Sequence, residues 1–148
     1  MAVGCEMECG RMEAFKREVN AYAEERILPE HLTRKLLIDA PLRFLEIDDA
    51  FLEGLDRLSP FGLGNPRPLF LTKGAEIVAA PRLLKKKHIK LLLRQEGRVF
   101  EALGWNRSDW ASSLRSGGRL DVVYTLHRTK YMGERGLSLY MEDIRPED

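Results

Sequence analysis

The segment from Ser59 to Pro68 constrains this chain most, because it separates two stretches that differ in hydrophobic periodicity. It holds three prolines and two glycines within ten residues. Proline fixes φ and lacks a backbone donor, while glycine reaches conformations closed to other residues, so we expect a shaped, stiff turn that acts as a hinge. An ordinary connection from a helix to a strand is the alternative. The residues that we assign to the hinge are Pro60, Phe61, Gly62, Gly64, Asn65 and Pro66. An aromatic side chain between proline and glycine also suggests that Phe61 is anchored in a core.

The residues before the hinge repeat with helical periodicity. Apolar side chains recur at short, helix-like intervals from Met12 to Leu28, which predicts an amphipathic helix that Pro29 ends. The apolar run 36–40 predicts a short strand, and an aspartate at 48 or 49 is expected to cap a second helix. These elements make a thin core. We therefore interpret residues 1–58 as one helical segment whose apolar faces pack on further material.

Beyond the hinge the apolar residues alternate, as they do in half-buried strands. Gly74 interrupts the first run and predicts a bulge. The predicted strands are 69–84, 88–94, 98–105, 120–128 and 137–144, and a short helix is predicted at 108–114. Five strands with a helix between the third and the fourth are typical of an OB-fold. We therefore predict an α+β chain in which residues 69–148 form a five-stranded antiparallel OB-fold β-barrel, with a small open sandwich as the alternative.

The charge of the chain is unevenly distributed. The net charge of the whole chain is only +1. Residues 1–65, however, carry 8 basic and 13 acidic side chains, a net charge of −5, while residues 66–148 carry 16 basic and 10 acidic side chains, a net charge of +6. A basic module indicates a polyanionic partner.

The first candidate nucleic-acid site is the basic run 85–90, at the start of the second predicted strand. Alternation places Lys90 and Arg94 on one face of this strand, so they would extend the charge of the run as a basic stripe. Such a stripe contacts phosphates without base specificity. A solvated turn is the alternative. The basic residues assigned to the site are Lys85, Lys86, Lys87, His88, Lys90, Arg94, Arg128, Lys130 and Arg135.

Aromatic side chains on which bases stack are the second requirement of a protein that binds single strands. The candidates are Phe100, Trp105, Trp110 and Tyr131. We expect Trp105 in the core. Tyr131 lies in a predicted loop between Lys130 and Arg135, and it is the preferred stacking residue.

The sequence offers little for catalysis or for metal binding. Cys5 and Cys9 have no second pair of ligands nearby, so we expect no zinc site there. The three histidines are scattered, and no serine or cysteine has a basic partner close in sequence. No apolar run approaches the length of a membrane span, and with no secretion signal before the cysteines we expect a cytoplasmic protein.

Several motifs resemble those of the RecJ-type single-strand-specific exonucleases. The segment Leu58–Pro68 followed by Phe70 is similar to that family's Leu-x-Pro-Phe-Gly-x-Gly-Asn-Pro-x-Pro-x-Phe. Further similarity lies in Lys87–Leu91, in Asp121–Tyr124 and in the segment from Leu139 to Arg145. Ala2-Val3-Gly4 resembles the residues that follow the Gly-Gly-His motif of the family's DHH-associated domain. One departure is Thr129, which stands where the family often has asparagine.

The resemblance implies the C-terminal part of an enzyme that degrades single-stranded DNA from the 5′ end with Mn²⁺ or Mg²⁺, in recombination and repair. The metal-binding residues of that family lie in an N-terminal DHH domain whose motifs do not occur here, so no catalytic residue, metal ligand or cofactor is assigned to this chain. Residues 1–58 would be the end of the DHH-associated domain, 59–68 the hinge, and 69–148 the OB domain. The implied partners are single-stranded DNA, the catalytic DHH domain and single-strand-binding protein.

A second class of function stays open from the sequence. An OB-fold of this kind can be a protein-interaction module that contacts the catalytic core or a replication partner, with its lysines as ordinary surface residues. Dependence of DNA affinity on salt distinguishes the two classes.

Overall fold

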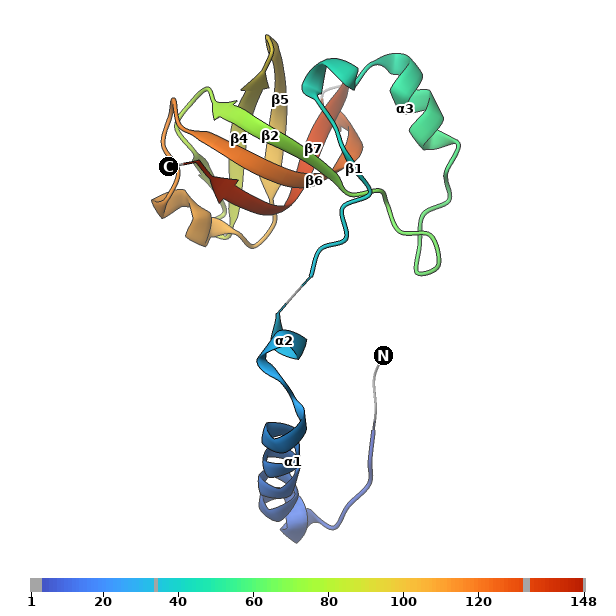
Figure 1. The fold of residues 1–148 in the computed structure, drawn as a ribbon, viewed down its shortest axis with the longest axis vertical. Helices are drawn as coiled ribbons and strands as arrows, with labels where there is room; N and C mark the ends of the chain where they lie inside the picture. The colour runs from blue at the N-terminus through green and yellow to red at the C-terminus, as the bar shows by residue number, and fades with distance from the viewer. Residues whose placement is uncertain (1–3, 34, 132–133, 148) are drawn as a thin grey trace. The chain divides into compact units, whose positions relative to one another are not determined.

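The computed structural model of the 148-residue chain describes residues 4–33, 35–131 and 134–147, with backbone alone for residues 130–131 and 134–135 (Figure 1). It divides into two compact units, Met1–Leu36 and Leu37–Asp148. We call the second the barrel unit.

The first unit is helical. It contains the 3₁₀ helix η1 (Cys9–Arg11) and the helices α1 (Met12–Arg26) and α2 (Pro29–Leu32). The helix predicted from Met12 is confirmed as α1. Its apolar residues Met12, Phe15, Val19 and Tyr22 are all exposed, and none of the described residues of this unit is buried.

The described part of the barrel unit holds a seven-stranded sheet. Five strands close it into a barrel in the order β2-β4-β5-β7-β6 and back to β2. These strands are β2 (Phe70–Ile77), β4 (His88–Gln95), β5 (Arg98–Gly104), β6 (Arg119–Tyr131) and β7 (Glu134–Pro146). Two short strands, β1 (Ala40–Pro41) and β3 (Arg82–Leu84), pair with β2 and β4 respectively. The predicted OB-fold is confirmed, with one refinement, since β5 and β7 pair in parallel while the other barrel pairs are antiparallel.

A bulge in β2 allows the barrel to close. The register between β2 and β6 shifts between Thr72 and Ala75, and Gly74 there has a left-handed φ of 65°. Only glycine adopts this backbone readily. The bulge bends β2 from its partner β6 toward β4, where Glu76 pairs with Arg94.

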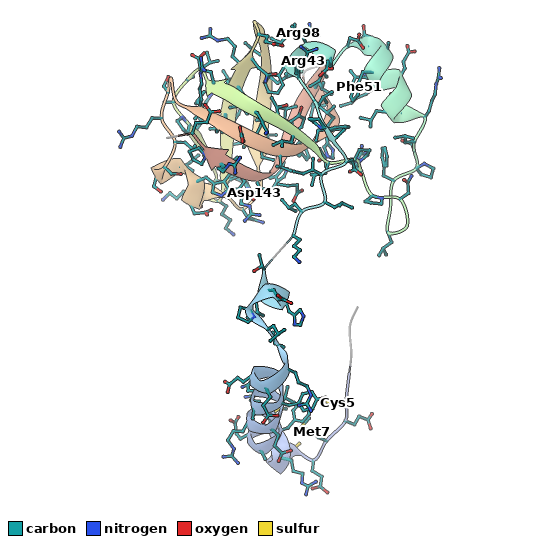
Figure 2. The ribbon with its side chains drawn as sticks, viewed as in Figure 1. Cys5, Met7, Arg43, Phe51, Arg98 and Asp143 are labelled. Atoms are coloured by element: carbon teal, nitrogen blue, oxygen red, sulfur yellow. The ribbon has the colours of Figure 1, made fainter. Side chains whose placement is uncertain are left out.

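Short helices lie at both ends of the barrel. The 3₁₀ helix η2 (Phe44–Glu46) and helix α3 (Asp49–Asp56) lie at one end, and the 3₁₀ helix η3 (Ser108–Ser112) lies at the other (Figure 1). Asp48 caps α3 as expected, because its carboxylate accepts the Phe51 N–H at 2.8 Å. Arg98 of β5 donates to the Ile47 carbonyl at 3.0 Å, so η2 is tied to the barrel rim (Figure 2).

Residues 37–58 belong to the barrel core, which corrects the predicted domain boundary. Leu42, Phe44, Ile47 and Leu52 are buried together with the inward residues of the strands. The ring of Phe44 packs edge-on against Phe100 at 5.0 Å. The chain therefore divides after Leu36 and not at 59–68. The assignment of the N-terminal residues to a DHH-associated domain stays a prediction.

The predicted hinge is a structured loop inside the barrel unit, between α3 and β2. The backbones of Gly62 and Asn65 bond to each other at 2.8 and 3.1 Å. The Asn65 side chain also donates to the carbonyls of Leu58 and Pro60, at 2.7 and 3.0 Å. The loop is thus a shaped turn. Because it lies within one compact unit, it does not separate two domains.

Two expected details of this loop are wrong. Phe61 lies outside the core, and its ring is covered by the Arg67 guanidinium at 4.6 Å. Neither Gly62 nor Gly64 has a left-handed φ, and Pro66 is exposed. The hydrogen bonds of Asn65, rather than glycine geometry or an aromatic anchor, hold the loop.

A buried chain of hydroxyl groups fixes β1 to the barrel. The Thr72 hydroxyl donates to the Leu42 carbonyl at 2.5 Å, so the Tyr124 hydroxyl, 2.9 Å away, donates to Thr72. Burial raises the pKa of Tyr124 to about 12, so the phenol stays protonated as a donor.

Replacement of Phe44 by alanine is expected to destabilise the barrel unit by about 3–5 kcal/mol, because the ring is fully buried at the end of the barrel. The matched control is the neighbour Leu45, which is 50% exposed and should cost little as alanine. Urea unfolding followed by tryptophan fluorescence measures both variants, since Trp105 and Trp110 both lie in this unit. Equal losses in the two variants would contradict the packing described.

Candidate nucleic-acid interface

The outer face of β4 and β5 is built from alternate residues of two antiparallel strands. Register places Lys90 beside Leu103, Leu92 beside Glu101, and Arg94 beside Val99. Their chain neighbours Ile89, Leu91, Leu93 and Ala102 point inward and are buried. The face is therefore a mixture of charged and apolar side chains.

Four aromatic rings from different segments form a continuous row on this side of the barrel. Ring centroids are 4.8 Å apart between His88 and Trp105, 5.6 Å between Trp105 and Tyr140, and 3.9 Å between Tyr140 and His127. The row crosses β4, the residue after β5, β7 and β6. Trp105 is 46% exposed, so one large ring is open to solvent. We call these four residues the ring row.

Hydrogen bonds hold the two histidines at the ends of the ring row. The backbone N–H of Asn106 donates to Nδ1 of His88 at 3.0 Å, which leaves the proton of the neutral ring on Nε2. The His127 Nε2 lies 3.0 Å from the Thr125 hydroxyl. Burial of the ring, and secondly the positive charge of Arg67, lower the pKa of His127 against the opposing effect of Glu142. His127 is therefore favoured as the neutral ring that stacks on Tyr140.

The three consecutive lysines lie where the ring row begins. Lys85, Lys86 and Lys87 form the exposed turn between β3 and β4, next to His88. Lys85 and Lys86 have left-handed φ values of 50° and 57°, as a tight hairpin turn requires. We call these residues the lysine turn.

The basic stripe predicted along β4 is not continuous. Lys90 forms an ion pair with Glu101, and Arg94 forms one with Glu76 at 2.8 Å. The carboxylates come from β5 and β2, so they neutralise both cations across strands. Only pairing register brings these opposite charges together, and sequence parity within one strand does not show it.

Two further candidates serve the fold. Phe100 points into the barrel and packs on Phe44, because its strand partner is the inward residue Leu93. Arg128 forms an ion pair with Asp56 of α3. Both were predicted to contact nucleic acid, and the structure gives each an internal partner.

The two tryptophans differ from the prediction, and three other candidate residues have side chains that the structure does not describe. Trp105 is exposed, whereas Trp110 packs partly buried against the core beneath the Arg107 guanidinium. The backbones of β6 and β7 place Lys130 opposite Arg135 and Tyr131 opposite Glu134. The side chains of Lys130, Tyr131 and Arg135 are not among those described.

The site contains residues that the sequence reasoning did not select. Tyr140 and His127 lie in the middle and at the end of the ring row. Strand alternation is a signal that both face outward. The antiparallel pairing of β6 with β7 brings these two residues together, and the parallel pairing of β5 with β7, which places Leu103 next to Tyr140, joins them to Trp105.

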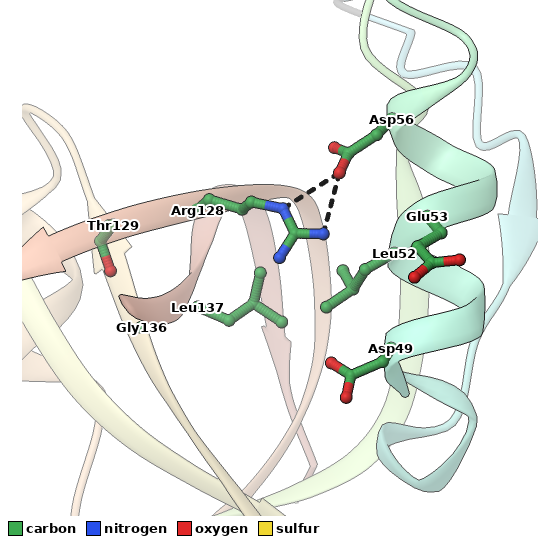
Figure 3. Close-up of a pocket in the computed structure, with 8 residues that line it drawn as sticks. All are labelled: Asp49, Leu52, Glu53, Asp56, Arg128, Thr129, Gly136 and Leu137. Carbon is green, nitrogen blue, oxygen red and sulfur yellow. Dashed lines mark hydrogen bonds and ion pairs between the residues drawn. The ribbon is translucent and has the colours of Figure 1, made fainter. Parts of the chain in front are cut away.

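A separate groove lies between α3 and the β6–β7 hairpin, with a volume of about 840 Å³ (Figure 3). Its helix side carries Asp49, Glu53 and Asp56, and Arg128 reaches across to Asp56 with two contacts of 3.1 and 2.8 Å. Acidic side chains repel phosphate, so this groove is not a continuation of the nucleic-acid face.

Within the described residues there is no group of three or more histidine, cysteine, aspartate or glutamate side chains that fits a metal ion. The same part of the chain has no helix that is long and apolar enough to cross a membrane.

Comparison with known proteins gives a consistent match. The family model described as the RecJ OB domain matches residues 38–143. The chain is 34% identical over 97% of its length to the single-stranded-DNA-specific exonuclease RecJ of Thermus thermophilus, and 21% identical over 97% to that of Bacillus subtilis. It spans 20% and 18% of the lengths of these relatives. The crystal structure of Thermus thermophilus RecJ in complex with Mn²⁺ superposes with a TM-score of 0.72 and 27% identity, over 96% of this chain and 20% of that one.

Acidification is expected to destabilise the barrel unit through His127. Its pKa is lower in the folded state than the value of about 6.5 in an unfolded chain, so its contribution to stability is present above pH ~6.5 and is lost as the pH falls toward the folded value. The slope is at most about 1.4 kcal/mol per pH unit. Urea unfolding at a series of pH values between 7.5 and 5 measures it.

His127→Gln should remove this component of the pH dependence, whereas His31→Gln, on the exposed helix α2, should keep it. The same pH dependence in the His127 variant and the unaltered chain would contradict the assignment.

Proposed function

Since the chain belongs to the family of RecJ OB domains, we propose that it is part of a RecJ-like exonuclease that degrades single-stranded DNA in the 5′ to 3′ direction during recombination and repair. The family match supports this, as does the similarity to RecJ proteins along nearly the whole chain. We place the enzyme in the cytoplasm.

In this proposal the barrel unit binds single-stranded DNA without sequence preference. The observation that carries it is the ring row with its exposed Trp105. Stacking of a base on an aromatic side chain contributes about 1–3 kcal/mol and tolerates any base. The lysine turn beside His88 supplies positive charge for phosphates.

The proposed cleavage takes place elsewhere in the full-length enzyme. The described residues offer no set of ligands for a divalent ion, so Mn²⁺ or Mg²⁺ would be held by a catalytic DHH domain outside this chain. That domain and single-strand-binding protein are the proposed protein partners. The barrel unit would hold the strand for the catalytic domain.

A protein-interaction module is the second candidate function. An apolar groove of about 500 Å³, lined mainly by Phe51, Leu55, Leu58, Pro68 and Phe70, favours it. The neutralised cations of β4 also fit this role. A chain with this function would bind no oligonucleotide even at low salt.

Trp105→Ala is expected to weaken binding of a fluorescein-labelled oligothymidylate by about fivefold or more, since one stacked base is lost. Fluorescence anisotropy at low salt measures the affinity. Tyr22→Ala is the matched control, because Tyr22 is an exposed aromatic residue of α1 in the other unit. Loss of affinity in the control, or none in the Trp105 variant, would contradict the proposed surface.

A further inference from the structure

The cations on the outer face of β4 are not available to phosphates without competition. Lys90 is paired with Glu101, and their side chains are only 28% and 37% exposed. Arg94 is paired with Glu76, with side chains 46% and 33% exposed. Each carboxylate is half-buried on a strand and lies beside its cation, so a phosphate that approaches Lys90 or Arg94 competes with it.

The part of the face between these ion pairs is apolar. Leu92 and Val99 are 38% and 49% exposed, and Leu103 lies between the Lys90 position and the ring row. Together with Trp105 they present carbon atoms and ring faces with no excess positive charge. Such a surface suits bases and disfavours bare phosphates.

The lysine turn carries an excess of positive charge, unlike Lys90 and Arg94 of β4, which are paired with carboxylates. Among the described residues no carboxylate lies within ion-pair distance of Lys85, Lys86 or Lys87, and all three are exposed. Positive charge is therefore concentrated at one edge of the face, and the ring row extends away from that edge.

We propose that Glu101 and Glu76 keep phosphates off this face by holding Lys90 and Arg94, so that a bound strand presents its bases rather than its phosphates to the barrel. The proposal rests on the proposed function, in which bases stack on the ring row, and adds to it the role of the two carboxylates on the strands. Unpaired bases contact the ring row and the apolar side chains, while phosphates contact the lysine turn. Duplex DNA is excluded because its bases are already paired and stacked.

The test compares two labelled oligonucleotides of equal length, one of thymidylate and one of abasic sites, which keeps the phosphates and removes the bases. At low salt the unaltered chain should bind the thymidylate strand at least fivefold more tightly than the abasic strand, because the abasic strand has no base to stack on the ring row. Equal affinity for the two strands would contradict base stacking on the ring row and overturn this inference with it, whereas the carboxylate variants below test this inference alone. Absence of binding to both would overturn the two together.

Glu101→Gln releases Lys90 for phosphate. It should tighten binding of the abasic strand by about two- to fivefold, the range expected for one surface ion pair, and steepen the dependence of log affinity on log salt by about 0.7, the value for one phosphate contact on a single strand. Glu76→Gln should act in the same direction through Arg94.

The matched control is Glu53→Gln, which makes the same change of charge on α3 and should alter neither the affinity nor the salt dependence by this amount. Circular dichroism shows whether each variant is folded. An abasic affinity in the Glu101 variant that is unchanged or lower, with the Glu76 variant behaving alike, would overturn the role of these carboxylates.

Discussion

The parallel pairing of β5 with β7 is the constraint on which the proposed site depends. It places Leu103 next to Tyr140. Trp105 follows Leu103 by two residues on the same face, so the ring centroids of Trp105 and Tyr140 lie 5.6 Å apart. In a closed sheet every strand has two neighbours, so an outward side chain meets outward side chains on both sides. The antiparallel pairs on either flank then add His88 and His127, and four residues far apart in sequence form one row.

Closure of the sheet also requires a filled interior, and this explains the role of residues 37–58. Phe44 occupies the end of the barrel against Phe100 and Tyr124, while Leu42 is held by the hydroxyl chain through Thr72. These residues precede the hinge motif in the sequence but belong to the core beyond it. The family match that begins at residue 38 agrees with this division.

Sequence reasoning predicted the elements well and the contacts between distant elements poorly. The period of the apolar residues located all five barrel strands and the bulge at Gly74, because these features depend on local backbone geometry. The predicted strand 69–84 is the exception, since it divides into β2 and the short strand β3, which pairs with β4. The sequence pattern did not identify the core residues Leu42, Phe44 and Ile47, because they lie in an irregular segment that has no hydrophobic period. The sequence predicted Trp105 in the core and Phe100 on the surface, and the structure shows the reverse. It also did not predict the carboxylates beside Lys90 and Arg94. Both outcomes depend on which strands pair and in which register.

The two tryptophans allow the most direct test of the central claim, since Trp105 belongs to the ring row and Trp110 packs against the core. The measurement is a ¹⁵N–¹H correlation spectrum of the indole N–H groups of the full chain during titration with oligothymidylate. The account predicts that the Trp105 signal shifts progressively and that the Trp110 signal stays nearly constant. Binding that shifts Trp110 and leaves Trp105 unchanged would contradict it.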